Sequence, residues 1–425
     1  MSEIASPRVK RTQRVALALL VISGVVNYID RSTLAVGAPL IREELNLSPA
    51  EFGLLSSAFL WAYAAAQLPA GALVDRLGAR LMLTISLTAW SFAQVVGGAV
   101  HSLSQFFGAR VLLGIGEAPQ FPTCARVTRD WFHPRQRGLT TGIWNSSSTL
   151  GSAIAVPVLT ILMLQVGWRW MFILMGILGI VLAAVIYVVH RNPNEVDLTP
   201  EERAHVTGGV PVSTTPMSLK DWGALFQYRT TWGLILGYFG SIYILWLYNS
   251  WLPQYLQLQW HLTIAKTGWV AAIPFAFGVV GSVSGGWLCD YLMARGFTPI
   301  NSRKVPMVTA LLATALFTFL TATAPTVTLA VTFISISMFL TYVSIASAWA
   351  TASVASGANN TASLGSLQNF GGYIGGALAP WITGLVVDEA TGSFEYALIV
   401  GAVIALAASL FFLVLVKGPV GQPAR

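Results

Sequence analysis

Long, continuously apolar stretches recur along almost the whole chain, from Val15 to Val416. Roughly 20 apolar residues let a helix cross the hydrocarbon layer of a membrane, and only helices or closed barrels satisfy their backbone hydrogen bonds there. The stretches do not alternate between apolar and polar residues, so helices are predicted. The predicted spans cover residues 15–38, 51–73, 80–100, 104–125, 138–163, 169–190, 229–256, 266–288, 304–323, 327–349, 362–387 and 393–416. We therefore predict an all-α membrane protein with twelve transmembrane helices.

Charged residues are scarce, and their placement predicts the orientation in the membrane. The chain is 55% hydrophobic and only 10% charged, whereas a soluble domain carries about a quarter of charged residues. Most Lys and Arg residues fall in the two tails or in alternate loops, with Arg8, Lys10 and Arg11 as examples. This bias predicts that both termini are cytoplasmic. The protein is expected in the inner (plasma) membrane. The net charge of +7 thus reflects topology, and no nucleic-acid partner is expected.

The apolar stretches fall into two sets of six, separated by a polar and proline-rich segment at residues 191–228. We predict an N-terminal six-helix bundle at 1–190, a cytoplasmic linker at 191–228 and a C-terminal six-helix bundle at 229–425. The two halves share a loop pattern in which Gly, Asp and Arg are spaced alike, at Gly71, Asp75 and Arg80 and again at Gly286, Asp290 and Arg295. Such internal repeats are typical of transporters and place a substrate near the midplane between the halves.

Four ionisable residues lie well inside predicted spans: Asp30 and Arg31 in the first, Arg110 and Glu117 in the fourth. A charge at this depth costs about 2.5–3.5 kcal/mol on insertion scales, so such residues usually have a function. Arg110 and Glu117 are two helical turns apart and share a helix face. At 1.5 Å per residue, Arg31 lies about 25 Å from the level of Arg14 and Arg110 about 9 Å from the opposite surface. Both arginines should therefore reach a similar level in the membrane.

Two guanidinium groups at one level can bind a carboxylate through forked hydrogen bonds. We hypothesise that Asp30 and Glu117 neutralise the arginines when the site is empty, and release them for an anionic substrate when protonated. This cycle would couple anion import to protons. The alternative is that the four residues form static ion pairs between the first and fourth spans, although apolar packing could replace such pairs at little loss.

The twelve spans, the central linker and the paired loops resemble the major facilitator superfamily over essentially the whole chain. In that family the loop belongs to a charge network that holds the outward-open state. The resemblance implies that Asp75 and Arg80 are members of this network here and that Asp290 is their counterpart in the second half. The second copy has Met293 where the first has Gly78, so its turn is expected to be looser.

The residues around the buried charges resemble the anion:cation symporter family, which includes bacterial galactonate, glucarate and hexuronate importers. The resemblance implies substrate binding by Arg31, Arg110, Tyr63 and Asn369, and proton binding by Asp30 and Glu117. One departure is that sugar-acid importers carry a glutamine soon after the Asn-Ser pair of the fifth span, where this chain has Ser147–Thr149. The motifs are Asn27-Tyr28-Ile29-Asp30-Arg31, Ala109 to Pro122, Ser57 to Tyr63 with Gln67 and Pro69, Gly142 to Ser146, and Gln368 to Gly372.

Other functions find little support in the sequence. There is no phosphate-binding loop, nucleophile elbow, dinucleotide fingerprint or metal-spaced His/Cys set, so neither an enzyme nor a cofactor is expected. Two isolated cysteines predict neither a disulfide nor a metal site. The expected protein is a monomeric, proton-coupled importer of a small organic anion such as a hexonate, hexarate or hexuronate. Import of an aromatic or other small carboxylate, or anion transport without proton coupling, remains the alternative, and a non-transporting receptor is a more distant one.

Overall fold

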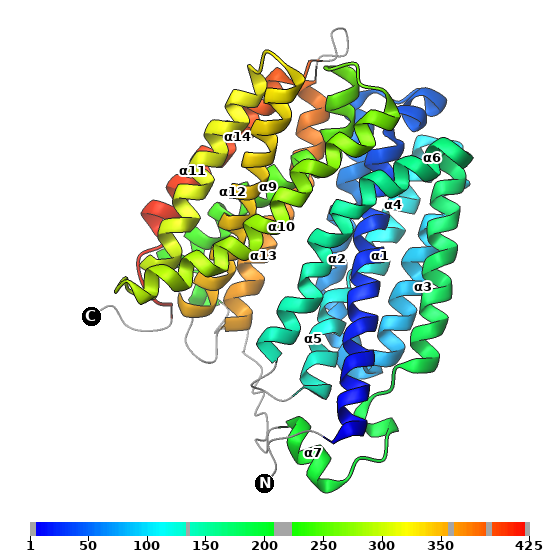
Figure 1. The fold of residues 1–425 in the computed structure, drawn as a ribbon, viewed down its shortest axis with the longest axis vertical. Helices are drawn as coiled ribbons and strands as arrows, with labels where there is room; N and C mark the ends of the chain where they lie inside the picture. The colour runs from blue at the N-terminus through cyan, green and yellow to red at the C-terminus, as the bar shows by residue number, and fades with distance from the viewer. Residues whose placement is uncertain (1–5, 133–136, 208–222, 356–360, 388–392, 421–425) are drawn as a thin grey trace. The chain divides into compact units, whose positions relative to one another are not determined.

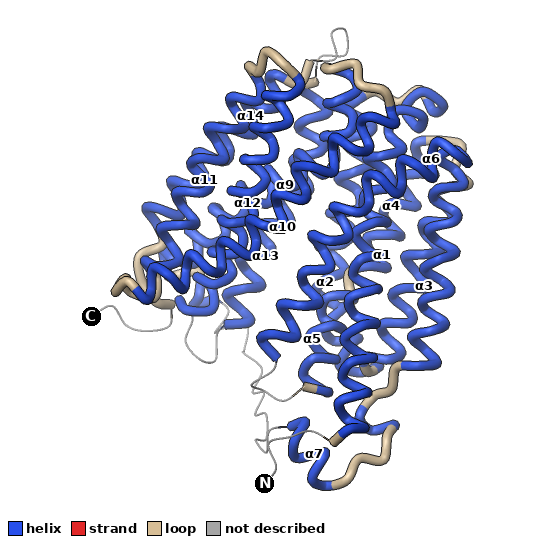
Figure 2. Tube along the Cα trace, viewed as in Figure 1, coloured by secondary structure: helices blue, strands red, loops and turns tan. Residues whose placement is uncertain are grey.

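The computed structural model describes residues 6–132, 137–207, 223–355, 361–387 and 393–420, apart from a few side chains within the helices. Helices and connecting loops make up these residues, and Figure 2 shows no strand among them. The main helices, labelled in Figure 1, are α1 (Pro7–Leu45), α2 (Pro49–Leu77), α3 (Ala79–Gly98), α4 (Leu103–Glu117), α5 (Gln120–Trp131), α6 (Arg137–Val189), α7 (Pro200–Thr207), α9 (Arg229–Leu258), α10 (Ile264–Ala294), α11 (Asn301–Ala322), α12 (Val327–Ala355), α13 (Thr361–Val386) and α14 (Glu395–Leu415).

The helices match the predicted spans closely, and the departures have local causes. The predicted fourth span is interrupted after Glu117 and continues as α5 beyond Pro119, because proline has no backbone N–H to donate to the preceding turn. The fifth and sixth spans run together as α6, with a break at Gly167, whose positive φ of 82° suits glycine. Among the described residues, eight helices are long and apolar enough to cross a membrane. The prediction of an all-α, multi-pass membrane protein is confirmed.

Contacts between Cα atoms divide the chain into two compact units. The first unit comprises residues 1–33 and 61–215, and the second comprises residues 34–60 and 216–425. The boundary passes through α1 and α2, so that the later part of α1 and the first part of α2 belong to the second unit. The predicted halves at 1–190 and 229–425 stay a prediction, because this division describes only where contacts are dense.

In the first unit, α3 packs against both α4 and α6. Gly116 lets the backbones of α3 and α4 approach closely, since a Cβ there would meet the backbone of Trp90. The hydroxyl of Ser86 also donates to the carbonyl of Gly116 at 2.6 Å. This close contact fixes α3 beside the residue that follows Gly116, which is Glu117.

The polar segment after α6 is folded onto the first unit. A 3-10 turn at Pro193–Glu195 leads to α7, and α7 contacts the start of α1. Ser6 donates a hydrogen bond to Glu202 at 2.5 Å, and Val9 and Val206 form a small buried cluster. The first part of the predicted linker therefore belongs structurally to the first unit.

In the second unit, α9 packs against α13 and α14, and α12 packs against α10 and α11. The turn that joins α1 to α2 also packs here. The ring of Phe52 lies 5.3 Å from that of Trp251 in a T-shaped contact, and Arg42 donates to the amide oxygen of Gln254 at 2.9 Å. A side chain at Gly53 would meet the carbonyl oxygen of Pro380, so this packing requires glycine.

Candidate functional site

The candidate site lies in the first unit, on α1, α2, α3 and α4. Asp30 and Arg31 are consecutive residues of α1, so their side chains point about 100° apart around the helix. Asp30 is directed at α3, where it bonds to Trp90 and Gln94. Arg31 is directed at α4, where it bonds to Glu117. One helix thus presents a carboxylate and a guanidinium to two different neighbours.

Arg31 and Glu117 form a buried ion pair. The Nε atom of Arg31 donates to Oε2 of Glu117 at 2.7 Å, and the two side chains are 8% and 0% exposed. The distance is that of a strong charge-assisted hydrogen bond. The Asn27 side chain, one helical turn before Arg31, also lies beside Glu117. The other carboxylate oxygen of Glu117, Oε1, is buried and makes no hydrogen bond in the structure, so the carboxylate could accept more donors than it has.

Two tyrosine rings face the Arg31 guanidinium. Its Cζ atom lies 4.7 Å from the ring centre of Tyr28 and 5.0 Å from that of Tyr63. Tyr28 is one turn before Arg31 on α1, whereas Tyr63 comes from α2 and is fully buried. Contacts between a guanidinium and an aromatic face contribute about 0.5–2 kcal/mol each, depending on desolvation. The rings hold the guanidinium in one orientation, as a planar ligand group requires.

Arg110 joins the same cluster from α4. It is 2% exposed and interacts electrostatically with both Glu117 and Arg31. Arg110 and Glu117 are both on the buried face of α4, as their spacing predicted. The two arginines and Glu117 are therefore brought together, which is the arrangement expected from the depth of these residues in the spans.

Asp30 has a different environment from the one expected. The ion pairs found among the described residues give an arginine partner to Glu117 and none to Asp30. Instead, Trp90 Nε1 donates to Oδ2 at 3.1 Å, and Gln94 Nε2 donates to Oδ1 at 3.2 Å. Sequence reasoning missed both residues of α3. The available signal was an indole and an amide spaced four residues apart inside an apolar span.

The position where sugar-acid importers carry a glutamine lies beside Tyr28. Ser147 is buried against Gly24 and donates to the Trp144 carbonyl at 2.5 Å. Ser148 lies next to the Tyr28 hydroxyl and donates to the Asn145 carbonyl at 2.7 Å. The side chain of Thr149 is outside the described residues. A short hydroxyl therefore replaces a long amide at this edge of the cluster.

Arg80, predicted to belong to a gating network, contacts the segment that follows α6. It pairs with Glu195 at 3.2 Å and lies 4.5 Å from the Tyr187 ring centre. Burial alone would raise the pKa of Glu195, but hydrogen bonds from Asn192 and the Arg80 charge hold this pKa below its usual range. The side chain of Asp75 is outside the described residues, and Asp290 is exposed on α10. The gating role of these three residues stays a prediction.

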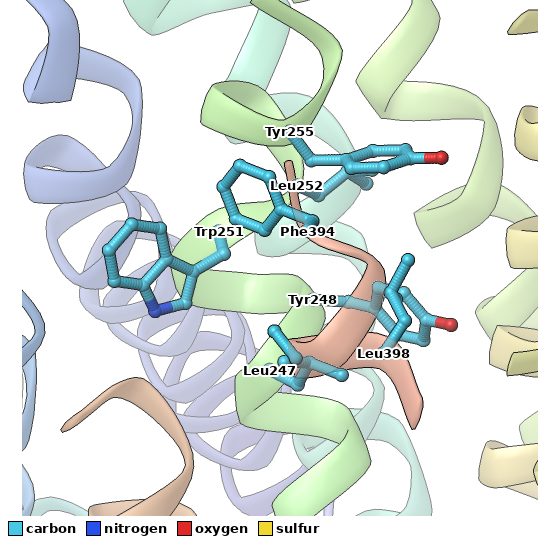
Figure 3. A pocket seen from close by; sticks show the side chains of 8 residues that line it. Leu247, Tyr248, Trp251, Leu252, Tyr255, Phe394 and Leu398 are labelled. Atoms are coloured by element: carbon cyan, nitrogen blue, oxygen red, sulfur yellow. The ribbon is translucent and has the colours of Figure 1, made fainter. Parts of the chain in front are cut away.

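Asn369, the fourth predicted substrate contact, is half-buried on α13 in the second unit, and its role also stays a prediction. The pocket drawn in Figure 3 is in the second unit as well. Its lining is apolar and aromatic, with Tyr248, Trp251, Tyr255 and Phe394 among the residues. Tyr248 donates from this lining to Thr318 at 3.2 Å, so it supports packing of α9 on α11. A lining without a charged side chain does not suit an anion.

The described residues contain no group of three or more His, Cys, Asp or Glu side chains that could hold a metal ion. The charged cluster of the first unit combines two arginines, Arg31 and Arg110, with two carboxyl groups, Asp30 and Glu117. Side chains of these kinds suit reversible binding of an anion, because no covalent bond to the protein is needed.

Comparison with known proteins identifies the family. Residues 20–380 match the family model described as Major Facilitator Superfamily. The probable L-galactonate transporter of Escherichia coli (strain K12) is 43% identical over 421 residues, covering 99% of this chain and 93% of that protein. The hexuronate transporter of Bacillus subtilis (strain 168) is 30% identical over 412 residues, covering 96% of both.

Solved structures agree on the fold. A bacterial homologue of the human lysosomal transporter Spinster, in an inward-facing and unoccupied conformation, has a TM-score of 0.73, with 19% identity and 95% of each chain covered. The relatives confirm the resemblance to anion:cation symporters that the motifs predicted. They also place the chain among transporters and not among enzymes. This chain therefore belongs to the major facilitator superfamily.

Proposed function

We propose that this protein imports a sugar-acid anion, such as a hexonate, hexarate or hexuronate, across the inner membrane together with protons. The observation that carries the proposal is the buried pair between Arg31 and Glu117, with Arg110 in electrostatic reach of both. Two relatives are named as a probable L-galactonate transporter and a hexuronate transporter, and these names support a sugar acid as the substrate. The basic residues of the tails support cytoplasmic termini.

The chemistry of the cycle follows from competition for one guanidinium. Glu117 is a carboxylate bound to Arg31, and the substrate is a carboxylate as well, so the two can replace each other. A hydrogen bond to a charged group contributes about 1.5–3 kcal/mol, against about 0.5–1.5 kcal/mol for a neutral one. Protonation of Glu117 therefore weakens its bond to Arg31 and favours the substrate. Loss of that proton after the site opens inward lets Glu117 displace the substrate.

The hydroxyl groups of a sugar acid need polar partners as well as charges. The hydroxyls of Tyr28 and Ser148 are neighbours at the edge of the cluster and can exchange hydrogen bonds with a polyol. An aromatic carboxylate would use the Tyr28 and Tyr63 rings instead of these hydroxyls. Both substrate classes fit two arginines, so a direct comparison is part of the test.

The proposal is tested by uptake into proteoliposomes under an imposed pH gradient, with galactonate, glucuronate, glucarate and benzoate as substrates. We expect accumulation of at least one sugar acid when the outside is acidic. Glu117→Gln should lose this accumulation but keep exchange of labelled for unlabelled substrate, because an amide cannot carry the coupling proton. A sodium gradient replaces the proton gradient in a parallel series.

The control variant is Glu51→Gln. Glu51 bonds to the Ser48 backbone and hydroxyl at the start of α2, and glutamine also suits that capping position. The Glu51→Gln variant should accumulate substrate as the wild type does. If Glu117→Gln still accumulated substrate against its gradient when driven by protons, the proton role of Glu117 would be wrong. Uptake of benzoate alone would contradict the sugar-acid class, and uptake indifferent to pH would favour a uniporter or exchanger.

A further inference from the structure

The two donors that hold Asp30 have unequal chemistry, and the function proposed above does not use this difference. Trp90 and Gln94 are four residues apart on α3, so they lie on one face of that helix, and both are at most 1% exposed. Each donates to a different oxygen of the Asp30 carboxylate. Both oxygens therefore have an uncharged donor, which suits an ionised carboxylate.

Protonation of Asp30 changes what its oxygens need. One oxygen must then carry a hydrogen and find an acceptor for it. An indole N–H can only donate, whereas a glutamine amide has donors on Nε2 and an acceptor on Oε1. A hydrogen on Oδ2, which faces Trp90, would therefore have no acceptor in the indole. A hydrogen on Oδ1, which faces Gln94, can be donated to Oε1 if the amide turns.

We propose that the coupling proton of Asp30 is carried on Oδ1, and that the Gln94 amide then rotates so that Oε1 accepts it. Trp90 and Gln94 are in this view positioning residues for the proton step. This inference rests on the proposed function only in taking Asp30 as a proton site. It assigns the proton to one oxygen and gives Gln94 a different hydrogen bond in each state.

The rotation also changes the hydrogen bonds of Thr33. Gln94 Nε2 lies 3.1 Å from the Asp30 carbonyl and from the Thr33 hydroxyl, which itself donates to that carbonyl at 2.7 Å. When Oε1 takes the place of Nε2, the Thr33 hydroxyl must turn its hydrogen from the carbonyl to Oε1. The backbone of Trp90 is held against Gly116 of α4, so the indole donor stays in place. One donor is fixed and the other can turn.

The charged groups near Asp30 do not replace these donors. From the neighbouring helix α4, the charged residue that acts on Asp30 is Glu117, and it is paired with Arg31 of α1. Arg110 of α4 acts on Glu117 and Arg31. The hydrogen bonds to the Asp30 carboxylate thus come from uncharged side chains of α3, while Arg31 is paired with Glu117. The two functions are separated although Asp30 and Arg31 are adjacent.

The test compares Trp90→Phe and Gln94→Leu by the pH dependence of substrate uptake and by infrared difference spectra of the purified protein. Trp90→Phe removes a donor that favours the ionised form, so the proton should be held to higher pH, by about one unit. Gln94→Leu removes a partner from both forms, so its shift should be clearly smaller. If Gln94 acted only as a donor, the two shifts would be similar, and that result would overturn the proposal.

The infrared spectra test the rotation without depending on the Trp90 variant. On titration of the wild type, a protonated carboxyl band and a change in a glutamine side-chain amide band should appear together. Asp30→Asn should remove the Asp30 share of the carboxyl band and the amide change, while the band of Glu117 remains. Gln94→Leu should remove only the amide change. Absence of the amide change from the wild type would refute the rotation. A wild type that shows both bands but no proton-driven uptake would contradict the proposed function and leave this inference standing.

Two matched controls are available in the same unit. Trp144→Phe removes an indole that donates to the Thr128 hydroxyl at 3.1 Å. Gln120→Leu removes a buried amide that donates to the Ser23 hydroxyl at 2.8 Å. Neither change touches a carboxylate, so both should keep the wild-type pH profile. A shift in these controls equal to that of Trp90→Phe would show a general effect of packing and count against the proposal.

Discussion

Replacing Arg31 by lysine keeps the positive charge and removes the planar fork of donors. In the structure the guanidinium donates through Nε to Glu117 at 2.7 Å and stacks near two tyrosine rings. The contacts with the tyrosine rings are present before the substrate binds. Their free energy is therefore similar in the free and bound states and contributes little to substrate affinity. The forked contact with the substrate carboxylate does not cancel, because a lysine can reproduce only part of it.

The magnitude follows from the loss of one charged hydrogen bond to the substrate, about 1.5–3 kcal/mol. At 1.4 kcal/mol per factor of ten, the KM for a sugar acid should rise by about 10- to 100-fold in Arg31→Lys. The assay is initial uptake into proteoliposomes at saturating proton gradient, over a range of substrate concentrations. The maximal rate should change less than KM, because the charge is kept.

The control is Arg126→Lys, which alters a partly exposed pair with Asp130 one turn along α5. This variant should keep the wild-type KM, since pairs of this kind contribute about 0.3–0.5 kcal/mol to stability. Size-exclusion profiles establish that both variants fold. A wild-type KM in Arg31→Lys would refute the assignment of the substrate carboxylate to this guanidinium.

Three further outcomes are expected from measurements of stability. His190 is buried, and burial lowers its pKa to about 4. The free energy of unfolding should therefore be highest above the unfolded pKa near 6.5 and fall by up to about 3 kcal/mol as pH drops towards 4. His190→Gln should weaken this pH dependence in thermal unfolding, whereas His101→Gln, at an exposed site, should keep the wild-type pH dependence. Gly53→Ala should lower stability by about 1–3 kcal/mol through overpacking, while Gly108→Ala, with open space around it, should raise it or leave it unchanged. Gly78 has a φ of 77° and a ψ of 162°, a region that is essentially restricted to glycine, so Gly78→Ala should cost about 1–3 kcal/mol. An unchanged melting temperature would contradict the strain argument.

The sequence predicted the helices well because each span must be apolar over a fixed length. The boundaries of α9 at Arg229 and Leu258 lie within two residues of the predicted 229–256. The break between α4 and α5 was not predicted, although Pro119 stands at that point, because a proline inside a membrane helix can either kink or interrupt it. The position of Gly167 in a merged α6 also depends on how two spans join, which periodicity does not describe.

The site was predicted in part, because the sequence gives the depth of a residue along a helix but not the neighbouring helix that its side chain faces. Counting residues along a helix gives the depth of Arg31, Arg110 and Glu117, and the structure brings these three together. The direction of Asp30 was missed, because it depends on which helix lies on that side of α1. Trp90 and Gln94 of α3 could be assigned to it only once the packing of α3 on α4 was known.

The division of α1 between the two units has a mechanical consequence. The first unit ends its share of α1 at Thr33, and the second begins at Leu34. Thr33 is also the residue that shares Gln94 with Asp30. A rearrangement around Asp30 therefore occurs within one helical turn of the place where this continuous helix leaves one body for the other. A change of conformation at Asp30 would therefore act next to the point of α1 where its packing partners change from the first unit to the second.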